Sequence, residues 1–353
     1  MNFRIKLFNN KKANIILLDD NYANLQFEKL KYEVVNFKNV YIFYLLSSFF
    51  STIMYARNLS YFKKKYLKTL LMSYNSNIAI GHHINGFTYY YKHFFPNNKV
   101  ITYQLCRESD FSFSMIFKQN FIKPIHSDYF IVYDERHMNL FSKFVSSEYI
   151  IGGSVKNNEI KLEKKIKIYD IMLISEYRGL DDDNYFSVIN KFIAKKVSDY
   201  CVLNNMKFVV ALSSHRIDKR NKLNIQKEKS FFRSISSNII FPDINYSSYD
   251  IANTSKLIIC NDSNLGIELL SRKHKVLFLP FYGYFSQHHF FELLPNYEGD
   301  FWTRDINNIN NKIELLMKLN EKEWENIVEN SAKLIPFDLN NTILKNIINN
   351  LKN

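Results

Sequence analysis

The sequence predicts an α/β fold built from two parallel-sheet domains. Short apolar runs of strand length alternate with helical stretches along most of the 353 residues. This length is sufficient for two domains that each bury a core. Residues 152–167 combine two glycines, an Asn-Asn pair and a run of charges, which is typical of a linker. We therefore expect a first domain over residues 1–158 and a second domain, with a C-terminal helical tail, over residues 168–353.

In the first half, six apolar runs predict strands, and two stretches with apolar residues at helical spacing predict helices between them. The helices cover residues 61–74 and 135–144. The strands cover residues 14–19, 32–37, 78–82, 99–103, 128–133 and 149–152.

The second half repeats the alternation and then changes character. A long helix is expected over residues 183–204, and residues 305–353 have helical periodicity without a strand. The expected strands cover residues 169–175, 207–213, 238–241, 256–260 and 275–279.

The stretch from Lys256 to Leu279 predicts strand, polar turn, helix and strand in succession. Residues 261–263, Asn-Asp-Ser, are of the kinds that cap a helix. The first turn of such a helix offers backbone N–H groups and a partial positive charge at the carboxyl edge of a parallel sheet, where α/β proteins bind phosphorylated ligands. Gly266 permits close approach of a ligand or a neighbouring strand. Ordinary helix capping explains the same residues, so the pattern alone leaves both interpretations open.

A family resemblance favours the ligand site. Residues 262–268, Asp-Ser-Asn-Leu-Gly-Ile-Glu, resemble the D-S-T-L-G-x-E signature of surface-carbohydrate transferases of the GT-B type, a group that includes capsule and lipopolysaccharide Kdo-transferase-like proteins. Asn264 stands where that signature prefers threonine. Residues 94–107, with Cys106 in place of a glycine, and residues 128–134, 153–158 and 174–178 are similar to further family segments in the same order. The resemblance extends loosely over residues 75–295.

The resemblance implies a GT-B fold, with two Rossmann-like domains facing a central cleft and C-terminal helices that pack back across the hinge. It also implies metal-independent transfer, without a cofactor, from a nucleotide-sugar bound by the second domain to a cell-surface glycan or its lipid-linked precursor on the first. A CMP-ulosonate such as CMP-Kdo is the first choice of donor. Two alternatives stay open: a polyol-phosphate transferase that uses a CDP-alditol, and a non-catalytic glycan-binding or scaffold protein.

Candidate donor-side residues follow the strand ends of the second domain. Glu176 is expected to act as general acid or base or to hold the donor sugar, and Arg178 to neutralise phosphate. An ion pair between the domains is the competing interpretation of these two residues. The catalytic candidates are Glu176, Asp250, Asp262 and His288, and the donor-binding candidates are Ser175, Arg178, His215, Arg216, Ser263, Asn264, Gly266 and Glu268.

Candidate acceptor-side residues follow two strands of the first domain. His82 and His83 end one predicted strand, and Gln104 and Arg107 follow the next. A metal bound by the two histidines would need a third ligand, which the sequence does not provide. We therefore expect acceptor contacts here and no metal.

The charge is concentrated near the start of the chain. Residues 1–100 hold 14 Lys and Arg against 4 Asp and Glu, out of a formal net charge of +13 for the whole chain. Nucleic acid, an anionic membrane face or an acidic substrate would each match this surplus, as would lysines that are simply solvated. No nucleic-acid-binding motif is present. A lipid-linked acceptor at the cytoplasmic leaflet is the better expectation.

Three features bear on the cellular compartment. Cys106, Cys201 and Cys260 are widely spaced, which fits a reducing cytoplasm without disulfides or structural zinc. Residues 1–12 lack the apolar core and cleavage site of a signal peptide. Residues 40–56 are apolar but short for a membrane span, so we expect either a buried core helix or, with the lysines at 63–65 and 68, attachment to the membrane surface.

Overall fold

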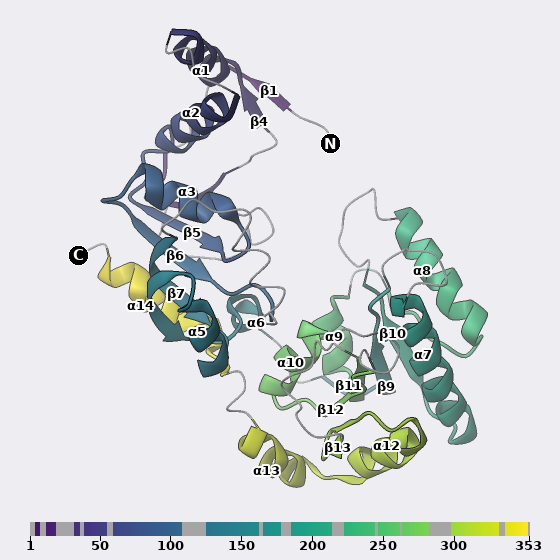
Figure 1. The fold of residues 1–353 in the computed structure, drawn as a ribbon. Coiled ribbons are helices and arrows are strands. Elements are labelled where there is room, and N and C mark those ends of the chain that lie inside the picture. The colour runs from purple at the N-terminus through teal and green to yellow at the C-terminus, as the bar shows by residue number, and fades with distance from the viewer. Residues whose placement is uncertain are drawn as a thin grey trace. The chain divides into compact units, whose positions relative to one another are not determined.

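The computed structural model describes thirteen stretches of the chain, and these form two compact units. One unit comprises Met1–Ile160 together with Pro336–Asn353, and the other Lys161–Ile335. The fold is shown in Figure 1. The described stretches are residues 4–7, 12–18, 32–35, 39–54, 59–107, 125–161, 165–177, 185–213, 222–243, 246–261, 263–281, 298–331 and 336–351.

The first unit holds a six-stranded parallel sheet in the order β3-β2-β5-β6-β7-β8, and a separate parallel pair formed by β1 and β4. Its elements are β1 (Arg4–Lys6), β2 (Ile15–Leu17), β3 (Tyr32–Val34), β4 (Asn39–Tyr41), α1 (Ile42–Met54), α2 (Leu59–Met72), β5 (Ile78–His82), α3 (Gly86–Phe94), β6 (Lys99–Tyr103), β7 (His126–Val132), α5 (Glu135–Phe141), β8 (Ser146–Ile151), α6 (Val155–Glu159), the short 3-10 helix η5 (Leu339–Asn341) and α14 (Thr342–Asn350).

Alternating side chains of these strands form a core on each face of the sheet. Ile15 and Leu17 point to one face, and Ile16 and Leu18 to the other, because successive residues of a strand point to opposite sides. The second face is covered partly by α2, whose Leu70 and Leu71 belong to the same cluster as Ile16. Strands buried on both faces explain the continuous apolar runs in the sequence.

The C-terminal helix α14 covers the other face of the first sheet. Its Leu344, Ile347 and Ile348 are buried in the same cluster as Ile15. The sequence predicts that residues 305–353 belong to the second domain, whereas the structure places 336–353 in the first unit. The helical periodicity of this tail agrees with α14, and the packing of α14 on the first sheet agrees with the return of the C-terminal helices that the family resemblance implies.

Residues 152–167, which the sequence predicts to form a linker, are structured and mostly buried in their first half. Ser154 caps α6, and the side-chain amide of Asn158 donates to the Gly152 carbonyl at 2.8 Å. Asn341 donates to the Val155 carbonyl at 2.8 Å, which ties the C-terminal segment to α6. The polar composition therefore reflects a buried hydrogen-bonded junction within the first unit.

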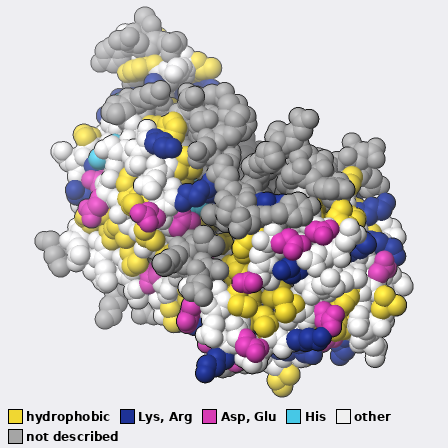
Figure 2. Space-filling model, turned by 60° about the horizontal axis from the view of Figure 1, so that its bottom comes forward, with side chains coloured by type: hydrophobic (Ala, Val, Ile, Leu, Met, Phe, Trp, Pro, Cys, Tyr) yellow, Lys and Arg dark blue, Asp and Glu magenta, His cyan; other side chains and the backbone are white. Residues whose placement is uncertain are grey.

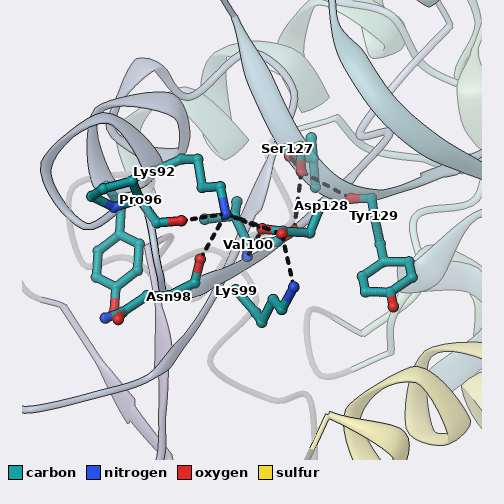
Figure 3. A network of polar contacts seen from close by, with 10 residues as sticks. Lys92, Pro96, Asn98, Lys99, Val100, Ser127, Asp128 and Tyr129 are labelled. Atoms are coloured by element: carbon teal, nitrogen blue, oxygen red, sulfur yellow. Dashed lines mark hydrogen bonds and ion pairs between the residues drawn. The ribbon is translucent and has the colours of Figure 1, made fainter.

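Asp128 in β7 connects the last turn of α3 to the start of β6 (Figure 3). It accepts hydrogen bonds from the Val100 backbone N–H at 2.8 Å and from the Lys92 ammonium at 3.0 Å, and Lys99 lies 3.3 Å away. Burial opposes ionisation of Asp128, but the hydrogen bonds from Lys92 and Val100 outweigh burial and hold its pKa below the ordinary value. The aspartate at the start of this apolar run thus has a structural role.

The second unit holds a sheet in the order β10-β9-β11-β12-β14-β13, parallel except for the last pair. The expected strand over residues 238–241 is reduced to a single bridge between Ile240 and Val209. The elements are β9 (Tyr169–Ile174), α7 (Tyr185–Leu203), β10 (Phe208–Ala211), α8 (Lys222–Ile235), α9 (Ser248–Asn253), β11 (Ser255–Cys260), α10 (Asn264–Ser271), β12 (Val276–Phe278), β13 (Glu298–Gly299), β14 (Trp302–Thr303), the 3-10 helix η3 (Ile306–Asn308), α12 (Ile309–Lys318) and α13 (Glu321–Ser331).

Two parallel-sheet domains of α/β type confirm the predicted fold class. The expected core helix over residues 40–56 is corrected: within α1 only Ser48 is buried. Among the described residues, no helix combines the length and apolarity needed to cross a bilayer.

Candidate functional site

The second sheet reverses its strand order between β9 and β11. From β9 the chain adds β10 on one side and then crosses to add β11 on the other. All three strands are parallel, so their carboxyl ends lie at one edge of the sheet. In open α/β sheets, ligands bind outside the carboxyl ends at such a switch point. The residues that follow β9 and β11 are therefore the first to consider as a site.

Glu176 and Asn261 meet across this switch point. Glu176 follows β9 and Asn261 follows β11, and the Asn261 side-chain amide donates to the Glu176 carboxylate at 3.3 Å. The Asn261 side-chain oxygen accepts from the Phe281 backbone N–H at 3.0 Å, which links the segment after β12 to the same point. Asn261 is buried, while Glu176 is half-buried. The carboxylate is thus held by a fixed amide at the edge of the sheet and remains partly open to solvent.

A second network holds the chain on the other side of Glu176. The fully buried Glu228 of α8 accepts from the Ser175 hydroxyl at 2.5 Å and from the Ser213 backbone N–H at 2.8 Å. The Tyr177 backbone N–H donates to the Ser175 hydroxyl at 3.1 Å, and Asn190 accepts from the Glu176 N–H at 3.1 Å. Ser175 therefore has a structural role in fixing the turn that carries Glu176.

The amino end of α10 adjoins this site because only two residues separate Asn261 from Asn264, the first residue of the helix. Ser263 is the N-cap and accepts from the Leu265 N–H at 3.3 Å, and the Gly266 N–H donates to the Ser263 carbonyl at 3.0 Å. Both amides are already used within the cap. A bound anion would still be stabilised by the dipole of α10. It could also accept a hydrogen bond from the Ser263 hydroxyl if the 3.3 Å bond from the Leu265 N–H to this hydroxyl were given up.

Gly266 and Glu268 face the interior of the unit. A Cβ at Gly266 would lie 2.3 Å from Cys260 Sγ and 3.0 Å from Phe278 Cε1. Glu268 is buried and accepts a short hydrogen bond from the Tyr249 hydroxyl. Gly266 was expected to allow close approach of either a ligand or a neighbouring strand, and the structure shows close approach to the strands that hold Cys260 and Phe278. For Glu268 it shows a buried contact with Tyr249 in place of the open face that a ribose contact would need.

Asp250 lies at the opposite edge of the sheet. It completes the capping box of α9 and pairs with Lys165, four residues before β9, at 3.1 Å. Residues that precede β9 and residues that follow it are separated by a strand of six residues, or roughly 20 Å. The structure therefore does not bring Asp250 together with Glu176.

A cavity of about 540 Å³ at this opposite edge is lined by several cations. Two of them lie in ion pairs, with Lys256 2.8 Å from Asp170 and Lys273 3.4 Å from Glu329. Two others, Lys167 and Lys275, donate to the backbone carbonyls of Asn253 and Leu319. Acidic and basic side chains also alternate over the face of the second unit visible in Figure 2. These lysines therefore have partners within the second unit, and we do not assign an anion site to this cavity.

In the first unit, the acceptor-side candidates link successive strand ends. His83 is fully buried, and its Nδ1 accepts from the Leu105 backbone N–H at 3.1 Å. Gln104 is also buried and accepts from the Tyr133 N–H at 2.8 Å. These bonds connect β5 to β6 and β6 to β7, so His83 and Gln104 hold the sheet edge together.

His82 and Arg107 remain the acceptor-side candidates with partial exposure. The His82 ring lies edge-on to Tyr103, with ring centroids 6.3 Å apart. Burial, and secondarily repulsion from His83, lower the pKa of His82 to about 4. His82 is therefore neutral near pH 7, and its ring can accept a hydrogen bond there.

Five predicted site residues, Asp262, Arg178, His215, Arg216 and His288, lie outside the described residues. The sequence did not predict two residues of these networks: Asn261, whose amide contacts Glu176, and Glu228, which accepts from Ser175 and Ser213. The sequence does hold a signal for Glu228, because this carboxylate stands on the apolar stripe of α8, four residues before the buried Phe232.

The two Rossmann-like parallel-sheet domains define a GT-B-type fold. S. aureus MnaA, in a co-structure with UDP, is similar in fold, with a TM-score of 0.55 at 14% identity over 97% of this chain and 96% of that one. UDP-GlcNAc 2-epimerase from Neisseria meningitidis, bound to UDP-GlcNAc, gives 0.52 at 12% identity over 96% and 99%. The wall teichoic acid polymerase TagF gives 0.52 at 12% identity over 97% and 89%.

The chain belongs to the family described as "putative O-antigen biosynthesis protein", whose model matches residues 105–352. This stretch contains the whole second unit and the end of the first sheet. It therefore includes every residue around the switch point. A comparison with curated proteins returned no match.

Proposed function

We propose that the protein is a glycosyltransferase of surface-glycan biosynthesis that moves a sugar from a nucleotide-sugar to a glycan or its lipid-linked precursor. The observation that carries this proposal is the Glu176–Asn261 contact across the switch point beside the amino end of α10. Membership of an O-antigen biosynthesis family supports the substrate class.

The three parts of the site have complementary chemical roles in this proposal. The amino end of α10 stabilises negative charge as it develops on the departing nucleotide phosphate. Glu176 accepts the proton of the attacking hydroxyl or a hydrogen bond from the donor sugar. Asn261 keeps the carboxylate oriented, so that little reorganisation is needed during the reaction. The acceptor is assigned to the first unit, where His82 and Arg107 are the partly exposed candidates.

The donor nucleotide is the finer part of the proposal. The resemblance of residues 262–268 favours a CMP-ulosonate such as CMP-Kdo. Two proteins of similar fold have UDP or UDP-GlcNAc bound. CMP-, UDP- and CDP-linked donors therefore all belong in the first assay, with metal-independent turnover as the expectation.

The test compares wild type with Glu176→Gln, Asn261→Asp and Asp250→Asn. Asn261→Asp keeps an oxygen for the Phe281 N–H but loses the donor to Glu176 and adds a like charge. We expect Glu176→Gln and Asn261→Asp each to lower kcat/KM at least tenfold, about 1.4 kcal/mol. Asp250→Asn is the matched control at the other edge and should change kcat/KM less than twofold.

The donor assay distinguishes the proposed glycosyltransferase from the alternative functions. Turnover of a CDP-alditol alone would support a polyol-phosphate transferase, and turnover of no donor would support a scaffold. Conversion of a free nucleotide-sugar without acceptor would indicate epimerase chemistry. Unchanged turnover in both Glu176→Gln and Asn261→Asp would remove the proposed site.

A further inference from the structure

Helices α1 and α2 form a hairpin at the outer end of the first unit. Figure 1 shows α2 between α1 and α3, and α1 packs on α2 while α2 packs on α3. In Figure 2, apolar side chains are visible directly beneath the grey atoms at the top, in the region where Figure 1 places α1. The hairpin precedes residues 105–352, the part matched by the family model.

The polarity of α1 is the reverse of that expected for a helix packed on a protein core. Its apolar side chains are exposed, among them Phe50 at 60% and Ile53 at 59%. Ser48 is buried on the opposite side of the helix, with Tyr44 and Thr52 partly buried one turn before and after it. In a water-facing helix the apolar stripe normally faces inward. The outward stripe therefore indicates an apolar partner outside the chain.

The inward polar side of α1 is satisfied within the helix itself. The Ser48 hydroxyl donates to the Tyr44 carbonyl at 2.7 Å, and the Thr52 hydroxyl donates to the Ser48 carbonyl at 2.7 Å. Hydroxyls bonded to the preceding turn can be buried against α2 at little cost. The reversed orientation is thus a stable packing, with the apolar stripe Leu46, Phe49, Phe50, Ile53 and Met54 left outside.

Neighbouring residues extend this surface and give it positive charge. Strand β1 pairs with β4, and Phe43 donates to the Leu7 carbonyl at 3.2 Å, which places the exposed Ile5 and Leu7 beside the start of α1. Lys63, Lys64 and Lys68 of α2 are exposed. Residues 34–107 contain no Asp or Glu. Among the described residues of β1, β4, α1 and α2, the exposed side chains are therefore apolar, basic or neutral polar, and none is acidic.

We propose that the hairpin docks on an anionic lipid bilayer, with the outward stripe of α1 at the level of the acyl chains and the lysines of α2 at the lipid phosphates. A helix of 13 residues is about 20 Å long, too short to cross a hydrocarbon core of about 30 Å, so it lies in the interface. A bilayer fits better than a protein partner because protein interfaces are depleted in lysine. This goes beyond the proposed sugar transfer and does not depend on it.

The experiment measures co-sedimentation of the full chain with vesicles of phosphatidylcholine alone or mixed with phosphatidylglycerol. Wild type should bind the mixed vesicles, and added salt should weaken binding. The variant Leu46→Ser/Phe50→Ser/Ile53→Ser should lose at least tenfold in affinity. Lys63→Gln/Lys64→Gln/Lys68→Gln should also lose at least tenfold, since each lysine near an anionic surface contributes about 1 kcal/mol, roughly fivefold.

The control is Leu203→Ser, which replaces an apolar residue that is 83% exposed in the second unit, and it should bind like wild type. Circular dichroism should be unchanged in all variants, because each replaced side chain is at the surface. Absence of wild-type binding to the anionic vesicles would overturn the proposal. A second result would also overturn it: wild type self-associates in analytical ultracentrifugation but does not bind vesicles, and Leu46→Ser/Phe50→Ser/Ile53→Ser does not self-associate. The apolar stripe of α1 would then bind a second copy of the chain. The readout is independent of donor turnover, so the two proposals can fail separately.

Discussion

Replacing Gly266 by alanine tests how closely α10 packs on the second sheet. The added Cβ would lie 2.3 Å from Cys260 Sγ, about 1 Å inside ordinary contact, which begins at 3.4 Å. Cys260 is fully buried in β11, so relief requires movement in a packed core. Overpacking of this kind costs about 1–3 kcal/mol, against a helix-propensity gain of up to about 1 kcal/mol for Gly→Ala. We expect Gly266→Ala to lower the free energy of unfolding by about 1–2 kcal/mol.

The structure also supplies the assay. The protein has two tryptophans, Trp302 and Trp324, and both lie in the second unit. Tryptophan fluorescence during urea unfolding therefore reports on the unit that contains Gly266, separately from the first.

A double-mutant cycle with Cys260→Ala supplies the control. With Sγ removed, the nearest obstacle is Phe278 Cε1 at 3.0 Å, so Gly266→Ala should cost less than half as much in that background. An equal cost in both backgrounds, or stabilisation of the otherwise native protein by Gly266→Ala, would refute the packing argument. It would then reopen the interpretation of Gly266 as a residue kept small for a ligand.

Three further changes test individual networks. Asp128→Asn should destabilise the first unit by about 1–2 kcal/mol near neutral pH. Because the pKa of Asp128 is lowered in the folded protein, ionised Asp128 stabilises the fold above its ordinary pKa, and this stabilisation is lost as the pH falls through the folded pKa. In an acid titration followed by circular dichroism, the stabilities of wild type and Asp128→Asn should therefore become equal at low pH. A stability difference that stays constant with pH would contradict this. Tyr249→Phe should cost about 1–3 kcal/mol in urea unfolding, since it removes a donor from the buried Glu268, and no loss would argue against that bond. Glu228→Ala should cost about 2–3 kcal/mol and Glu228→Gln clearly less, because the amide oxygen still accepts from Ser175 or Ser213; equal losses would show that charge, and not hydrogen bonding, matters.

Local patterns were sufficient where neighbours in sequence determine the structure. The strands expected at 256–260 and 275–279 and the helix cap at Ser263 correspond to β11, β12 and α10. The apolar run, the capping residue and the helical spacing all act within a few residues, so the sequence shows them directly. The predicted strand over residues 169–175 likewise corresponds to β9, so Glu176 lies beyond the carboxyl end of that strand as expected, and its role at the site stays a prediction.

Long-range packing accounts for what the patterns could not show. Glu268 is turned toward Tyr249, nineteen residues earlier in the chain, and no periodicity reveals that contact. The apolar run over residues 40–56 suggested a core helix because apolar residues usually pack inward, yet α1 turns its hydroxyls inward. Two-residue strands such as β13 are also too short to carry a pattern.

The central claim is that a nucleotide-sugar binds at the carboxyl edge between β9 and β11, with its phosphate at the amino end of α10. Hydrogen–deuterium exchange of the full chain with and without a saturating nucleotide-sugar tests this most directly. We predict added protection in residues 175–177 and 261–267, and no change in residues 246–256 at the other edge. Protection confined to residues 246–256, or none at 261–267 with a donor that the protein demonstrably binds, would contradict the claim.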